Sequence, residues 1–376
     1  MRIVLKNVSR IAHADIKLGG ITVIGGEDCT GKSAVSKALF GSLVSANKWL
    51  EDFGDQIDED GFVCSPSTKK KVGSERILEE YVSRWFNEIF FNKIGFLSGV
   101  SKVDVIFDHG INTITFDYTQ DRFNQCDVSF GRDVFFATHY IGNPFVLDYL
   151  NKVYDLYTID TIERNVVENV IKAKRELATD KMTDIFDEAE NKEKLQDVYA
   201  AMKKVLKGEV KIQDNLYYYC DERGNKIDFR GVSTGLKSFL FIERLLDSVK
   251  LKKGDVLIID KPEAYMHPEW QLVYAEVIVL LQKALDLTVL IITHSFHFLE
   301  SLDFFMKKHG SFDRSNFYIP RKTKCGAGYT IAESADNLHD IMKSLSQPVF
   351  DLSDMKFEFE MEQNQEDRDY KCDKEE

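Results

Sequence analysis

The sequence predicts an α/β protein with a mixed sheet, an antiparallel β subdomain and a helical insertion. Short apolar runs that end in glycine or a polar residue are typical of buried strands, and three of them are Ile21–Ile24, Val256–Ile259 and Thr288–Ile292. Helices are predicted after the first two runs, from Lys32 and from about Pro268. Residues 103–118, "VDVIFDHGINTITFDY", alternate apolar and polar side chains around a turn, which predicts an antiparallel hairpin.

The first 147 residues form the predicted N-terminal lobe. We expect strands at 2–8 and 14–24, a helix from Lys32, a polar surface loop at 52–75 and a second helix at 76–94. The hairpin turns at His109–Gly110, and another strand ends at Ile141. This order places a glycine-rich loop between a buried strand and a helix.

Residues 148–210 are predicted to form the helical insertion, because strand patterns disappear and two helical stripes take over. One stripe contains Ile162, Val166, Val170, Ile171 and Leu177, and the other contains Leu195, Val198, Met202, Val205 and Leu206. Residues 211–345 return to alternating strands and helices, with a turn at 223–225, and form the predicted C-terminal lobe. The remainder, 346–376, is an acidic tail whose last dozen residues we expect to be disordered.

Composition narrows the class of protein. The chain of 376 residues has 44% hydrophobic residues, enough for a sizeable core, and a formal net charge of -13 argues against coating nucleic acid by overall charge. Its six cysteines form no CxxC pair, so they indicate neither a zinc site nor a disulfide framework. The sequence lacks a signal-peptide core and a run of 18 apolar residues, so we expect a cytoplasmic protein without a membrane span.

The glycine-rich loop fits the pattern G-x-x-x-x-G-K-[ST], which binds nucleoside triphosphates. Its residues are Gly26, Glu27, Asp28, Cys29, Thr30, Gly31, Lys32 and Ser33. Backbone N–H groups and the helix N-terminus, which includes Ala34, bind phosphate, Lys32 reaches the outer phosphates, and the Ser33 hydroxyl binds Mg²⁺. The predicted cofactors are therefore ATP and Mg²⁺. Glu27 and Asp28 are unusual here, because their carboxylates must point away from the phosphates or towards a partner group.

Three further features complete the predicted site. Asp260 ends a buried strand, where its carboxylate can orient Mg²⁺, and His294 ends another, where it can sense the outer phosphate. Ser233, Thr234 and Gly235 stand at a predicted helix start, a position that suits an anion but also an ordinary helix cap.

In this order, the motifs resemble the ABC-type ATPase heads, above all the soluble SMC-like, RecF-like and OLD-like AAA-labelled branch, many members of which act in bacterial antiviral defence. "STGLKSF" at 233–239 looks like that branch's signature motif, and "IDKPEAYMHPEWQ" at 259–271 looks like its acidic strand motif. The resemblance is firm for residues 1–47 and 225–300. It implies a P-loop NTPase fold and a homodimer in which Lys32 of one head and Ser233 of the other sandwich each ATP.

Lys261 departs from the family pattern, which has a glutamate at this position to polarise the attacking water. A lysine is a cation at neutral pH and does not accept that proton unless its pKa is strongly depressed. We therefore place Lys261 at the general-base position but expect impaired hydrolysis. Glu263 and Glu269 lie nearby, yet neither obviously replaces the missing base.

Three functions remain open from the sequence. The first is a slowly hydrolysing, ATP-dependent dimeric switch that controls a separate effector protein, in a setting such as phage defence. The second is a DNA repair or recombination ATPase that uses the helical insertion as an arm, with nucleic acid bound near the basic runs at 67–71, 202–207 and 321–324. The third is a pseudo-ATPase scaffold without turnover.

Overall fold

A computed structural model describes the architecture of most of the chain. The described residues are 1–53, 62–64, 71–90, 94, 99–107, 110–119, 122–129, 137–151, 159–177, 194–213, 216–247, 251–324, 326, 328–335 and 338–372. Within these ranges an 11-stranded mixed sheet forms the centre of the fold, in the order β8-β7-β6-β1-β2-β16-β15-β3-β14-β13-β9. Its strands are β1 Arg2–Val8, β2 Ile11–Lys17, β3 Ile21–Gly25, β6 Gly99–Phe107, β7 Gly110–Thr119, β8 Arg122–Ser129, β9 Thr138–Ile141, β13 Val256–Asp260, β14 Thr288–Thr293, β15 Asn316–Lys322 and β16 Tyr329–Glu333.

The parallel half of this sheet runs β15-β3-β14-β13-β9. In β3, β9 and β13 every residue is buried, as expected for parallel strands covered on both faces. Because parallel strands end at the same edge of a sheet, the ends of β3, β13 and β14 bring Gly25, Asp260 and Thr293 to one edge.

The antiparallel half runs β8-β7-β6-β1-β2 and contains the predicted hairpin. Here β6 and β7 pair with Phe107 opposite Gly110, which confirms the predicted turn, although His109 itself lies outside the described residues. The polar segment predicted as a loop also contains a small hairpin of β4 Phe62–Cys64 and β5 Lys71–Gly73. A third, separate sheet consists of β10 Glu209–Gln213, β11 Leu216–Cys220 and β12 Lys226–Asp228.

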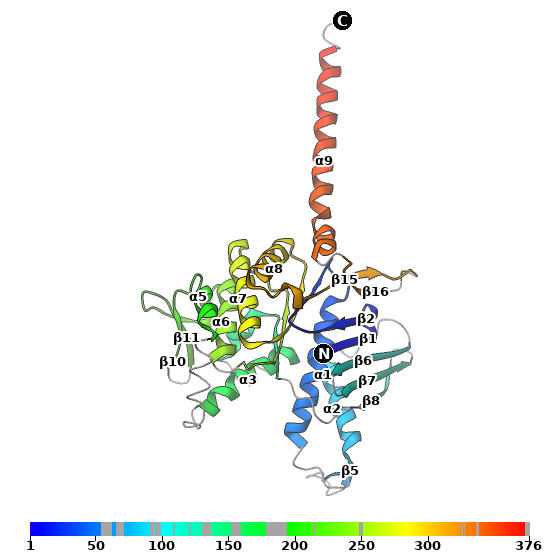
Figure 1. Cartoon of the computed structure of the whole chain (residues 1–376), viewed down its shortest axis with the longest axis vertical. Coiled ribbons are helices and arrows are strands. Elements are labelled where there is room, and N and C mark those ends of the chain that lie inside the picture. Colours follow the sequence, from blue (N-terminus) through cyan, green and yellow to red (C-terminus); the bar gives the residue numbers. More distant parts are fainter. Residues whose placement is uncertain are drawn as a thin grey trace.

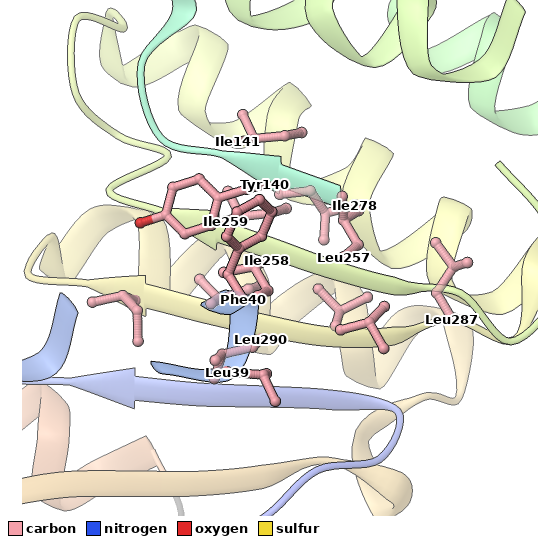
Figure 2. Close-up of a cluster of buried hydrophobic side chains, with 14 of the residues drawn as sticks. Leu39, Phe40, Tyr140, Ile141, Leu257, Ile258, Ile259, Ile278, Leu287 and Leu290 are labelled. Carbon is pink, nitrogen blue, oxygen red and sulfur yellow. The ribbon is translucent and has the colours of Figure 1, made fainter. Parts of the chain in front are cut away.

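The helices lie around this sheet, as Figure 1 shows. They are α1 Lys32–Phe53, α2 Ser74–Ile89, α3 Thr161–Leu177, α5 Gln196–Met202, α6 Thr234–Asp247, α7 Pro268–Leu285, α8 Phe296–His309 and α9 Leu338–Cys372, with single turns at Pro144–Tyr149, Phe229–Gly231 and Phe312–Arg314. Figure 2 shows how α1 packs on the parallel half: Leu39 and Phe40 lie against Ile258, Leu290 and their neighbours. The rings of Phe40 and Tyr140 pack edge to face, with their centroids 5.4 Å apart.

The described part of the predicted insertion contains the helices α3 and α5, which pack against the body, and its last two residues begin the strand β10. Ile162, Val166 and Val170 of α3 and Val198 and Met202 of α5 belong to the main hydrophobic core. Residues 178–193 lie outside the described part. The described helices of the insertion therefore contribute side chains to the core.

Two C-terminal features differ from the sequence prediction. The strands β15 and β16, which we did not predict, enter the sheet between β3 and β2. The acidic tail, whose last dozen residues we expected to be disordered, is instead helical as far as Cys372 in α9, which projects from the body in Figure 1. No described helix is both long and apolar enough to cross a membrane.

Candidate functional site

The glycine-rich loop connects the end of β3 to the start of α1. Its backbone takes positive φ angles at Gly26 (144°), Cys29 (60°) and Gly31 (92°). A Cβ atom on Gly26 would lie 2.9 Å from Pro320 Cδ, and one on Gly31 would lie 3.0 Å from Ile11 Cγ1. Both glycines are therefore required by close packing as well as by backbone angle. Cys29 adopts the left-handed conformation without being glycine, at a cost of about 1–2 kcal/mol.

Lys32 is buried inside this loop, with 5% of its surface exposed. Its Nζ donates to the carbonyl oxygens of Gly26, at 2.7 Å, and Glu27, and lies 3.4 Å from Thr30 Oγ1. Burial lowers the pKa of Lys32, and the Asp28 carboxylate opposes that shift. The carbonyl groups of Gly26 and Glu27 therefore hold the ammonium group inside the loop.

At the end of β13, the Asp260 carboxylate accepts hydrogen bonds from three hydroxyl groups. Ser33 Oγ donates to Oδ1 at 3.1 Å, while Ser36 Oγ and Tyr140 Oη donate to Oδ2 at 3.0 and 2.8 Å. The carboxylate is 8% exposed, so these bonds replace most of its water. The two residues predicted to bind Mg²⁺, Ser33 and Asp260, thus lie in direct contact.

Tyr140 and Ser36 are site residues that the sequence analysis missed. Burial, and then the neighbouring Asp260, raise the pKa of the Tyr140 hydroxyl well above its usual value, so it stays a neutral donor. Tyr140 is the residue before the last in β9, which lies beside β13, and Ser36 lies one turn after Ser33. A hydroxyl-bearing residue near the end of a predicted strand was the signal that could have identified Tyr140.

The side chain of Lys261 lies beside the glycine-rich loop, called the phosphate loop below. Its φ is 57°, an uncommon conformation for a lysine, and its Nζ lies 3.7 Å from Asp28 Oδ1. His294 Nε2 lies 3.6 Å from the same oxygen of Asp28. Asp28, the carboxylate that looked misplaced in a phosphate-binding loop, therefore faces both predicted site residues.

The Glu263 carboxylate contacts both the backbone and the imidazole ring of His294. Its Oε1 accepts the backbone N–H of His294 at 3.0 Å and lies 3.4 Å from His294 Nδ1. The residue is 7% exposed, and its Oε2 has no hydrogen-bond partner among the described residues. Glu263 is thus a buried carboxylate that orients His294, and Lys261 is the residue that faces the phosphate loop.

The helix start at Ser233–Gly235 lies apart from this cluster. Ser233 is exposed and its carbonyl accepts the backbone N–H of Lys237. A Cβ on Gly235 would lie 3.0 Å from the Trp270 ring, so the backbone is packed closely there. Within the described residues, no hydrogen bond or ion pair joins Ser233, Thr234 or Gly235 to the phosphate loop.

Two adjoining cavities border the loop. One of about 400 Å³ is lined by Asp28 to Ala34, Arg10, Lys37 and Lys261, and one of about 280 Å³ by Ser33, Lys37, Tyr140, Asp260 and Lys261, among others. Arg10 also donates to the Cys29 carbonyl at 2.9 Å, which fixes the loop. These cations and the N-terminus of α1 suit a triphosphate.

The side chains also suit Mg²⁺ that is bound together with phosphate. The described residues contain no group of three or more His, Cys, Asp or Glu side chains arranged to hold a metal by themselves. Mg²⁺ commonly takes only one or two protein ligands and completes its shell with phosphate and water. Ser33 and Asp260 would be those ligands.

Comparison with known proteins gives one family and several solved structures. Residues 131–300 match the family described as "AAA domain, putative AbiEii toxin, Type IV TA system". Similar solved structures are the SMC head domain from Thermotoga maritima, with 11% identity, TM-score 0.42 and coverage of 89% of this chain and 98% of that one, and an SMC head bound to the C-terminal winged-helix domain of ScpA, with 10% identity, TM-score 0.49 and coverage of 91% and 98%. A third is an SMC head with an extended coiled coil, bound to the C-terminal domain of ScpA, derived from Pyrococcus furiosus, with 11% identity, TM-score 0.47 and coverage of 92% and 98%. No curated protein matches this sequence significantly.

Proposed function

We propose that this chain is an AAA-type ATPase head that acts as an ATP-binding switch, hydrolyses slowly and controls a separate effector protein. The observation that carries this proposal is Lys261, which follows Asp260 at the position of the expected carboxylate base and faces Asp28 of the phosphate loop. Phage defence is the setting that the family resemblance favours.

Binding of MgATP rests on residues that lie together. Lys32 and the backbone of the loop would hold the outer phosphates, and Ser33 and Asp260 would hold the metal. Bound Mg²⁺ supplies charge neutralisation at the phosphates. Arg10 and Lys37 add positive charge around the same cavity.

Slow hydrolysis follows from the groups near Asp260. A general base contributes about 10²–10⁴ in rate, or about 3–5 kcal/mol of barrier. Lys261 does not supply it as a cation, and Glu263 is buried beneath His294 with Oε1 bound to a backbone N–H. The head would then keep its nucleotide for longer, which suits a switch better than a motor.

Dimerisation is the second part of the proposed function. The N-terminus of α6 is exposed at Ser233 and is not joined to the phosphate loop of its own chain by any described contact. Its free N–H groups suit an anion that a second copy presents. We propose that ATP bound at Lys32 of one copy is closed by Ser233 of the other.

A turnover assay with two variants at one position tests the proposal. We expect the chain to release phosphate from ATP well below 1 s⁻¹, the lower end of the usual range for enzymes. Lys261→Glu should raise the rate at least tenfold, while Lys261→Gln, which removes the same positive charge without adding a base, should not. Ordinary turnover by the unaltered chain, or equal effects of the two variants, would show that Lys261 does not limit hydrolysis.

A further inference from the structure

The helix α9 projects from the body (Figure 1), and large apolar side chains along it are exposed to solvent. These side chains are 51–68% exposed: Val349, Phe350, Leu352, Met355, Phe357, Phe359 and Met361. So many exposed large apolar residues within 13 positions are unusual for an isolated surface. The described part of this chain does not cover them, so they are available to contact another surface.

Part of this set continues a seven-residue repeat that begins in the core. Leu338 and Ile341 are buried against the body, and Leu345 is partly buried. The same a and d positions of the repeat then continue through Pro348, Leu352, Met355 and Phe359. Every a and d position from 338 to 359 is therefore apolar, which is the pattern of a coiled-coil seam. We call Leu352, Met355 and Phe359 the α9 seam.

The charged residues beside the seam are complementary to a second copy of the same helix. In this register Asp351 occupies a g position and Lys356 the following e position. In a parallel, in-register pair, each g residue faces the e residue five positions later in the partner helix. Asp351 of each copy would thus meet Lys356 of the other. An antiparallel pair would lack this match, because g residues then face g residues.

We propose that the α9 seam pairs with the α9 seam of a second copy, parallel and in register. This contact requires no nucleotide, so it is separate from the ATP-dependent closure proposed above. It would keep two heads near each other between cycles and raise their effective concentration for closure.

The acidic residues of the tail limit the strength of this pair. Residues 346–376 contain eleven acidic and four basic side chains, so two parallel tails repel each other at low ionic strength. Salt screens this repulsion and leaves the apolar seam intact. We therefore expect association through α9 to tighten as salt rises, the opposite of a contact held mainly by ion pairs.

The other exposed strip of α9 provides a matched control. Phe350, Phe357 and Met361 lie on the opposite side of the helix, because they are spaced seven and four residues apart and out of step with the seam. Phe357 is 65% exposed and Phe359 is 58% exposed. Phe357→Asp and Phe359→Asp thus remove equal side chains and add equal charges on opposite faces.

The test uses the full chain without nucleotide, in light scattering after size exclusion across a range of concentrations. Phe359→Asp should raise the dimer dissociation constant at least tenfold, whereas Phe357→Asp should change it less than threefold. A monomer at all concentrations, or equal effects of the two variants, would overturn the proposal. A dimer lost only with Phe357→Asp would assign contact to the other strip and would also overturn it.

Cross-linking provides a second measurement that does not depend on disruption of the helix. In a Cys372→Ser background, Leu352→Cys should form an intermolecular disulfide with its own copy, because equivalent a positions meet in a parallel pair. Asp354→Cys, on the far side, should cross-link no more than the background chain. Equal cross-linking at both positions would contradict the seam. Loss of ATP binding with normal cross-linking would instead count only against the proposed ATPase switch.

Discussion

Replacing Asp28 with asparagine should make the chain bind ATP more tightly. The Asp28 carboxylate lies 3.7 Å from Lys261 Nζ and 3.6 Å from His294 Nε2, two groups that we expect to face the terminal phosphate. A bound triphosphate would compete with Asp28 for these partners and would also meet its negative charge. Asp28→Asn keeps the shape of the side chain and removes both effects.

The expected gain in ATP affinity can be estimated from the distance between Asp28 and Lys261 and from the exposure of both side chains. Two unit charges 3.7 Å apart interact by about 1 kcal/mol in water. The side chains of Asp28 and Lys261 are 66% and 46% exposed, so the pair belongs among surface ion pairs, which contribute about 0.2–1 kcal/mol. The His294 contact adds to this only while the imidazole is protonated. Loss of the competition should therefore tighten ATP binding by a factor of about 2–5.

Calorimetry with a non-hydrolysable ATP analogue and with ADP measures this effect. Asp28→Asn should tighten binding of the ATP analogue more than that of ADP, because only the former carries the terminal phosphate. Glu27→Gln removes the same charge from the neighbouring residue and should change both affinities alike. The reasoning would be refuted if Asp28→Asn weakened ATP binding, matched Glu27→Gln, or kept its full effect in a Lys261→Met background.

Two further predictions concern other parts of the molecule. Ser233→Asp places a negative charge at the exposed start of α6 and should abolish ATP-induced closure in small-angle scattering while ATP affinity in calorimetry stays within about twofold; unchanged closure would count against the sandwich. Burial raises the pKa of Glu243 to about 7 from 4.5, because the folded state favours the neutral carboxyl group. The free energy of unfolding is therefore unaffected by Glu243 ionisation below about pH 4.5 and falls as pH rises through about 7. Glu243→Gln should therefore raise the free energy of unfolding by up to about 3 kcal/mol at pH 8 and by much less at pH 5, and equal effects in thermal unfolding at both pH values would contradict this.

The local elements of the site were predictable because each has its own signal in the sequence. The glycine loop, the apolar run before Asp260 and the run before His294 all end where predicted, to within a residue or two. Parallel strands end at one edge of a sheet, so the contact between Ser33 and Asp260 could be predicted without knowing which strands are neighbours. These contacts follow from short-range patterns and one rule of sheet geometry.

Long-range pairing was not predictable in the same way. The strand β16 pairs with β2 on one side and β15 on the other, and β15 pairs with β3, so segments about 300 residues apart are neighbours. Nothing in the composition of Asn316–Lys322 or Tyr329–Glu333 identifies these partners, because pairing depends on which edges remain open after the other strands have paired. Tyr140 and Ser36 also bind Asp260, but they were missed because neither belongs to a recognisable motif, whereas Ser33 is part of the glycine-rich loop pattern.

The error in the tail has a different cause. Disorder was inferred from its high charge, which is an average over many residues. In the structure these residues continue the helix α9, which begins at Leu338 with a seven-residue apolar repeat that runs to Phe359. The repeat predicts the first part of the helix, and its continuation from Phe359 to Cys372 has no comparable signal in the sequence.

The site has two unusual features, Asp28 in the glycine-rich loop and Lys261 at the position of the expected base, and their contact explains both. A carboxylate in a phosphate-binding loop opposes its ligand, and a lysine at the base position does not activate water. Because Asp28 lies against Lys261, the lysine partly neutralises the carboxylate before nucleotide binds, and the carboxylate holds the lysine over the loop. The left-handed φ of Lys261 and the Glu263–His294 contact beneath it help to fix this arrangement. A terminal phosphate would then have to replace Asp28 at both partners, so the site would respond to the presence of that phosphate even where hydrolysis is slow.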